Sequence, residues 1–156
     1  GQTPLRSPSV FNYYRPGYVA PGSQSAARGL VAPELQIASE TTAAGYVNFM
    51  RDAVGSGVGA TNTVVNGVAL NRRDIQPDFS AELALAATDV PGLVARVAGR
   101  LTFGQLGSAA QADIATAVAT IAIPATGQAS IDSAKRNRVN AAVLLVLASP
   151  EFQVVK

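Results

Sequence analysis

Apolar residues in the second half of the chain recur at the spacing of helices that bury one face. The longest stripe follows Asp89, a residue suited to cap a helix, and consists of Val90, Leu93, Val94, Val97 and Leu101. A shorter helix should begin at Ser80 as its cap and carry Leu83, Ala86 and Ala87. A third should open with Ser108 and Gln111 as a capping box and turn Ile114, Val118 and Ile121 inward before Pro124 and Gly127 stop it.

The last helix should start at Ser130 or Ile131, with Asp132 in its first turn able to pair with Lys135 or Arg136. Residues 141–148 are apolar on every side, which is typical of a helix buried in the middle of a bundle. Ser149-Pro150 should end it.

An earlier helix is predicted from Pro33 to about Val54, with a break around residues 39–42. Its second half is amphipathic, and the shared face that we expect to be buried carries Tyr46, Phe49, Met50 and Ala53. Glycines at 55, 57 and 59 should end the helix.

A small hairpin or looped excursion is predicted over residues 63–70, because Asn66-Gly67 separates two short apolar runs and favours a type I′ turn. Two strands alone are marginally stable in water, so this hairpin would have to rest on the helices or on a neighbouring chain.

The first 32 residues are rich in proline and glycine, which predicts an extended arm interrupted by turns. Two of these turns, at residues 15–18 and 20–23, have Pro followed by Gly at the central positions, the pattern of a type II turn. Large aromatic side chains at Phe11, Tyr13, Tyr14 and Tyr18 accompany them. We expect the arm to be held by packing of these rings against the helices.

The sequence therefore predicts an all-α fold, a bundle of about five helices with an extended Pro- and aromatic-rich N-terminal arm and one small β-hairpin. We expect one helical domain over residues 1–156, with the arm at 1–32, a helix at 33–55, a loop or hairpin at 56–78 and further helices at 79–149.

The amino-acid composition limits the kinds of catalysis and binding that this chain can perform. The chain has no histidine and no cysteine, so it lacks the commonest general base and every thiolate ligand or nucleophile. It is 48 % hydrophobic and only 14 % charged, which suggests that part of its apolar surface meets a partner. The net charge of +2 comes from scattered arginines and lysines, so nucleic acid is not an expected partner.

Few residues suggest a site. Tyr13, Tyr14, Arg15 and Tyr18 could contact a ligand or a partner, for example by stacking on a sugar or a base, although packing of the arm against the helices is the better explanation of them. The alternating glycines at 55–59 lack the spacing of a nucleotide-binding loop. A hard-cation site could be drawn from Asn71, Asp74, Asp78 and Glu82, but Arg73 and Pro77 interrupt it and the calcium-loop pattern is missing. We therefore assign no catalytic, cofactor-binding or metal-binding residues.

Several segments together resemble a known family. The opening Gly1-Gln2-Thr3-Pro4 and the stretch at residues 7–18 are similar to a part of the bacterial proteins grouped as domain of unknown function 1800. Residues 32–37, 78–83 and 149–154 resemble that family's C-terminal portion in the same order, whereas residues 55–70 carry no motif of it.

The resemblance implies that the chain is the C-terminal part of a longer polypeptide, whose remainder would be its first partner. It also implies an exported bacterial protein, located in the cell envelope or secreted, possessing no known catalytic residues. We expect a structural or protein-interaction module, with another exported protein as a further partner and no transmembrane segment. Two alternatives stay open: one wall of an enzyme active site whose catalytic residues lie elsewhere, and a carbohydrate- or nucleic-acid-binding surface on the aromatic arm.

Overall fold

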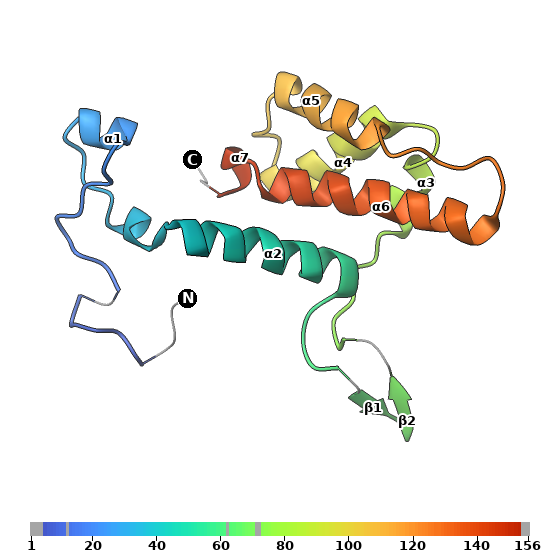
Figure 1. Cartoon of the computed structure of the whole chain (residues 1–156), viewed down its shortest axis with the longest axis horizontal. Helices are drawn as coiled ribbons and strands as arrows, with labels where there is room; N and C mark the ends of the chain where they lie inside the picture. The colour runs from blue at the N-terminus through green and yellow to red at the C-terminus, as the bar shows by residue number, and fades with distance from the viewer. Residues whose placement is uncertain (1–4, 12, 62, 71–72, 154–156) are drawn as a thin grey trace. The chain divides into compact units, whose positions relative to one another are not determined.

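The computed structural model describes residues 5–11, 13–61, 63–70 and 73–153. The chain divides into two compact units, residues 1–48 and 49–156, and the division falls inside helix α2 (Glu40–Ser56). Figure 1 shows the elements of each unit in chain order. Each unit is described below by itself.

Unit 1, residues 1–48, has little regular structure before α2. It contains the single-turn helix α1 (Gln24–Ala27) and the 3-10 helix η1 (Pro33–Ile37). Both predicted turns close, through the Tyr18 amide to the Arg15 carbonyl at 3.0 Å and the Ser23 amide to the Ala20 carbonyl at 3.3 Å. Only the second is type II, because Gly22 has a φ of 69° whereas Gly17 is not among the residues of positive φ.

The predicted break in the first long helix is confirmed. η1 ends at Ile37, and α2 begins after Ser39, whose side chain and backbone form a reciprocal cap with Thr42. The Ser39 amide donates to Thr42 Oγ1 at 2.8 Å, and the Thr42 amide donates to Ser39 Oγ at 3.3 Å. These local bonds satisfy amides at the helix start and separate it from η1.

The buried face predicted for α2 is partly wrong. Phe49 is 59 % exposed, whereas Met50 packs against the core of unit 2 and Val54 belongs to it. Met50 and Val54 are four residues apart and share one side of the helix, while Phe49 lies about 100° around the axis from Met50. The core therefore takes only the last turns of α2, along a line shifted from the predicted one.

The hairpin is confirmed. Strands β1 (Thr63–Val65) and β2 (Val68–Leu70) pair antiparallel with Val65 opposite Val68, and Asn66 and Gly67 both have positive φ, as a type I′ turn requires. Figure 1 shows the hairpin standing apart from helices α3 to α6. Val64 and Val68 are exposed, so these two side chains do not rest on those helices.

Unit 2, residues 49–156, holds the helical body. Its helices are α3 (Ser80–Leu85), α4 (Val90–Thr102), α5 (Ser108–Ala119), α6 (Gln128–Leu147) and the short α7 (Pro150–Gln153). Helix α4 packs against α3, α5, α6 and α7, and α5 also packs against α6. The apolar stripe predicted on α4 is thus the centre of the unit.

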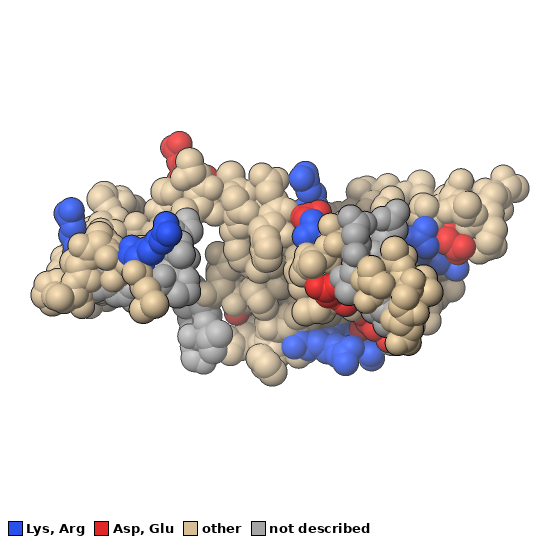
Figure 2. Space-filling view, turned by 90° about the horizontal axis from the view of Figure 1, so that it is seen from below, with Lys and Arg blue, Asp and Glu red and all other residues tan. Residues whose placement is uncertain are grey.

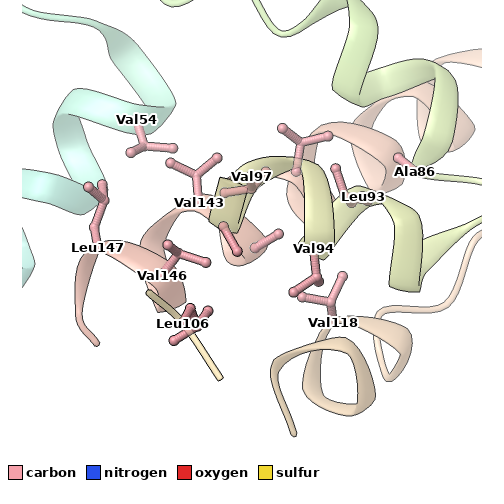
Figure 3. Close-up of a cluster of buried hydrophobic side chains, with 13 residues drawn as sticks. Val54, Ala86, Leu93, Val94, Val97, Leu106, Val118, Val143, Val146 and Leu147 are labelled. Atoms are coloured by element: carbon pink, nitrogen blue, oxygen red, sulfur yellow. The ribbon is translucent and has the colours of Figure 1, made fainter. Parts of the chain in front are cut away.

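The core lies where α4, α5 and α6 meet, with Leu106 from the α4–α5 loop (Figure 3). Leu93 and Val94 of α4, Val118 of α5 and Val146 of α6 are completely buried. Full burial of each such side chain contributes about 1.5–3 kcal/mol relative to its exposure. The stripes of α4 and α5 confirm the inward faces predicted from the sequence.

Two predicted caps are wrong, because other groups reach the same helix ends. At α3 the carboxylate of Asp78 accepts from the Ser80 amide at 2.9 Å, so the residue two positions earlier supplies the bond. At α5 Ser108 is already helical and Gly107 is the cap, while Gln111 donates to the Leu106 carbonyl at 2.8 Å. The Asp89 cap of α4 is confirmed by its bond from the Gly92 amide at 2.8 Å.

Helix α6 also departs from its prediction. It begins at Gln128, and Asp132 accepts from the Gln128 side chain at 2.8 Å, whereas the predicted ion pair with Lys135 or Arg136 is not among those of the described residues. Residues 141–148 are not buried on every side, because Leu145 is 38 % exposed and Ala148 is exposed. The helix lies against α4 and α5 and leaves its far side open.

The described chain is mostly helical with one small hairpin, as the sequence predicts for an all-α fold. None of its described helices combines the length and the apolar character that crossing a membrane requires.

Candidate functional site

The predicted contact residues of the arm lie in unit 1. Tyr13, Tyr14 and Tyr18 are half-buried, and Arg15 is exposed. Backbone groups of the arm fix it to the rest of its unit. The Tyr18 carbonyl accepts from the Ala32 amide at 2.8 Å, and the Arg15 amide donates to the side-chain oxygen Oε1 of Gln36 at 2.7 Å. Stacking of these tyrosines on a sugar or a base stays a prediction.

Apolar side chains of unit 1 are largely exposed. Among the described residues of this unit only Ala32 is buried. Phe11 is 60 % exposed, which contradicts the expected packing of that ring. The other large exposed apolar residues of the unit are Leu5, Val10, Val19, Leu30, Val31, Leu35, Ile37 and Val47. Nine large apolar side chains between residues 5 and 47 are thus open to solvent, and apolar surface of this kind favours contact with another molecule.

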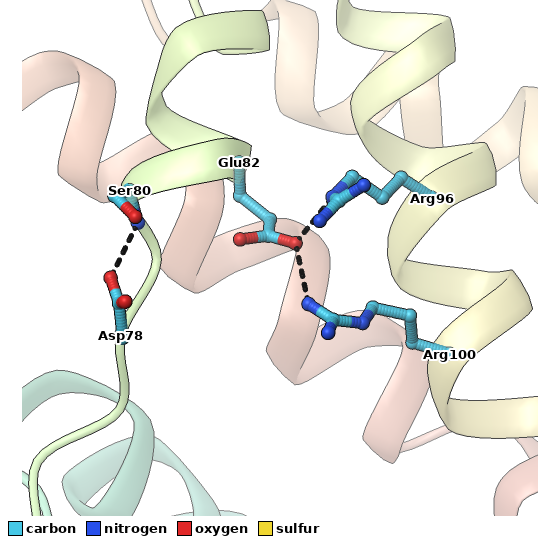
Figure 4. A network of polar contacts seen from close by, with 5 residues as sticks. All are labelled: Asp78, Ser80, Glu82, Arg96 and Arg100. Atoms are coloured by element: carbon cyan, nitrogen blue, oxygen red, sulfur yellow. Dashed lines mark hydrogen bonds and ion pairs between the residues drawn. The ribbon is translucent and has the colours of Figure 1, made fainter.

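In unit 2 the sequence prediction missed a buried carboxylate held by two arginines. Glu82 on α3 is only 4 % exposed. Its Oε1 accepts from Arg96 Nε at 2.7 Å and from Arg100 Nη1 at 3.4 Å, both on α4 (Figure 4). The two arginines are four residues apart, so they stand on the same side of α4 and face the same carboxylate. The cluster joins α3 to α4.

The charges of this cluster are complementary but unequally solvated. Burial raises the pKa of Glu82, yet the hydrogen bond from Arg96 and the positive charges of Arg96 and Arg100 outweigh it, so the pKa lies below its ordinary value. The side chains of Arg96 and Arg100 are 40 % and 66 % exposed. Glu82 therefore stays ionised in a buried position, while its partners keep part of their hydration.

Asp78 lies beside this cluster, before α3. Its Oδ1 accepts from the Ser80 amide, and this hydrogen bond lowers the pKa of the carboxyl. Figure 4 shows the second oxygen of Glu82 on the side of Asp78 and Ser80, away from the two arginines. A cavity of about 320 Å³ is lined by Asp78, Phe79, Glu82, Val97, Arg100, Leu101 and Val143.

The cation site considered for Asn71, Asp74, Asp78 and Glu82 is not assembled in the described residues. No group of three or more acidic side chains there could hold a metal ion, and Asn71 lies outside the described residues. Asp74 Oδ2 accepts from the Ala60 amide at 2.9 Å, and Glu82 is engaged by arginines. Both carboxylates thus make contacts with protein groups instead.

The Glu82 cluster was missed because the arginines were interpreted as solvated surface. The sequence did contain one sign of the cluster: Arg96 and Arg100 are four residues apart on α4, beside the buried Val97, so they lie on the same side of the helix. The partner could not be found from sequence, because it comes from a different helix 14 residues away.

Comparisons with known proteins give one match. A family model described as a protein of unknown function (DUF1800) matches residues 1–154, nearly the whole chain. Neither the curated proteins nor the solved structures contain a match.

Proposed function

This chain belongs to the DUF1800 family of proteins of unknown function, and from that premise we propose that it is a structural or protein-interaction module of an exported bacterial protein. One observation carries the proposal: most of the large apolar side chains described in unit 1 are exposed, and Ala32 is the one described residue of the unit that is buried. Burying such side chains against another polypeptide is favourable by about 25 cal/mol per Å².

The nature of the partner follows from the charge of the surface. Figure 2 shows a face on which uncharged side chains predominate over Lys, Arg, Asp and Glu. The basic residues described in unit 1 are Arg6, Arg15 and Arg28, spread along the sequence. Binding of nucleic acid through phosphates needs several cations on one surface, so an apolar protein surface is the better match.

Site-specific photocrosslinking in the native cell tests this function. A benzophenone amino acid replaces Phe11, which is 60 % exposed, and in a matched control it replaces Asn137, an exposed position of α6. We expect light-dependent crosslinks from position 11 to one defined protein surface, either within the same polypeptide or in a second protein, identified by mass spectrometry. Equal, diffuse labelling from both positions would overturn the proposal.

Export is the second part of the proposal and is tested separately. We expect the native protein in the envelope or extracellular fraction of its bacterium. Recovery of the protein only with cytoplasmic markers would contradict export, and it would leave the crosslinking result to decide the interaction itself.

A further inference from the structure

The cavity beside Glu82 combines an apolar lining with two separate charges. Val97 and Val143 are buried, and Phe79 and Leu101 are half-buried, so these four side chains form its apolar interior. Asp78 and Arg100 are exposed and line the same cavity, which places one negative and one positive group at its solvent side. The volume, about 320 Å³, is near the lower end of small-molecule sites, which span roughly 300–1,000 Å³.

Both charges keep hydrogen-bonding capacity. The Asp78 carboxylate accepts from Ser80, whose amide bonds Oδ1 at 2.9 Å, and its two oxygens together offer about four lone-pair sites, so it can accept further hydrogen bonds. Arg100 contacts Glu82 through Nη1 alone, at the long distance of 3.4 Å, and the guanidinium has five N–H donors. Glu82 is also paired with Arg96 at 2.7 Å, so Arg100 is not its only counter-charge and can bind a ligand carboxylate as well.

We infer that this cavity binds a small zwitterion with an apolar tail, that is, a free aliphatic α-amino acid. The ammonium group would bind Asp78, the carboxylate would bind Arg100, and the aliphatic side chain would cover Leu101 and Val143. An anion alone would give Asp78 no ligand partner, and a cation alone would give Arg100 none. The site belongs to unit 2 and does not depend on the interaction proposed for unit 1.

Saturation-transfer NMR on the full protein with L-leucine as the probe tests this site. Two analogues each lack one charge: 4-methylpentanoate has no ammonium group and 3-methylbutylamine has no carboxylate. We expect L-leucine to bind with a Kd of about 1 mM or tighter, and each analogue to bind about tenfold more weakly. Absence of transfer to L-leucine at about ten times that concentration would overturn the inference.

Variants locate the binding. Arg100→Gln and Asp78→Asn should each weaken L-leucine binding about tenfold, and asparagine keeps an oxygen that can accept from the Ser80 amide. Asp113→Asn, at an exposed position of α5 outside the cavity, is the control and should leave the Kd unchanged. Circular dichroism confirms that each variant is folded. Equal binding of leucine and both analogues, or unaltered binding in both cavity variants, would show only an apolar crevice and would refute the site.

Discussion

Arg138 on α6 donates through Nη1 to the backbone carbonyl of Ala86, 2.9 Å away, although 52 residues separate the two. Ala86 is the C-cap of α3, and the Nε of the same guanidinium donates to the carbonyl of Ile121, after α5, at 2.8 Å. One side chain therefore satisfies carbonyls beyond the ends of two helices and holds both against α6.

Replacement of Arg138 by methionine should destabilise unit 2. Two carbonyls would lose their donor, and one unsatisfied buried group costs about 1–3 kcal/mol. We expect the free energy of unfolding, measured by urea titration followed by circular dichroism, to fall by about that amount. Arg136→Met is the control, because Arg136 is exposed and contacts Ser133 on its own helix; it should change stability by about 0.5 kcal/mol or less. Equal losses in the two variants would contradict the role of Arg138.

The two hydrogen bonds of Arg138 also show which parts of this fold are predictable from sequence. The α4 stripe, its Asp89 cap and the Asn66-Gly67 turn were found because each depends on residues within a few positions of one another. The bonds from Arg138 depend on the docking of three helices, and no local pattern encodes them. An arginine in a helix is equally compatible with solvent.

The wrong caps have a related cause. Ser80 and Ser108 have the residue type of a cap, but a cap also requires a particular backbone position, and the helices include both residues. Phe79 and Gly107 occupy the cap positions, and at α3 the Asp78 carboxylate accepts from the Ser80 amide. The candidate site was missed because its residues are far apart in the sequence. Glu82 and its two arginines form a cluster only when α3 lies against α4.

The stability of the protein should depend on pH through Glu82. Its folded pKa is below the ordinary value, so ionised Glu82 stabilises the native state above the unfolded pKa, and this contribution is lost as the pH falls through the folded pKa. Between neutral pH and the acidic range below the ordinary glutamate value of about 4.3, stability should decline.

Glu82→Gln isolates this dependence. We expect the variant to be less stable than the native chain at neutral pH, by about 1–3 kcal/mol, because a hydrogen bond to a charged group is lost. The difference should shrink on acidification, as urea titrations at successive pH values would show. Asp132→Asn serves as the control and should keep the native pH dependence, because the Asp132 carboxylate accepts from the neutral Gln128 side chain and forms no ion pair among the described residues. A constant difference between Glu82→Gln and the native chain at all pH values would argue against an ionised, stabilising Glu82.

Two glycines at α2 should respond oppositely to alanine. Gly57, just after the helix, has a φ of 81°, and a Cβ there would lie 2.2 Å from the carbonyl oxygen of Ile75, so Gly57→Ala should cost more than about 1 kcal/mol. Gly45 is inside α2, and beyond its own helix backbone no atom of the described residues lies within 4 Å of the place that an alanine methyl group would take. Gly45→Ala should therefore stabilise by about 0.5–1 kcal/mol. Thermal unfolding of both variants measures the signs, and a loss at Gly45 would contradict its open surroundings.

The one-sided burial of α6 can be tested by making the same deletion at two leucines. Leu93 of α4 is completely buried, whereas Leu145 of α6 is 38 % exposed on the open side of its helix. Leu93→Ala removes core contacts and leaves a cavity, so it should cost about 2–5 kcal/mol. Leu145→Ala should cost about 1 kcal/mol or less, since its side chain is already partly hydrated and alanine favours the helix. Urea titrations of the two variants give the comparison. If Leu145→Ala were as costly as Leu93→Ala, the outer side of α6 would be covered in the native protein, and α6 would be the fully enclosed helix that its apolar sequence at residues 141–148 predicts.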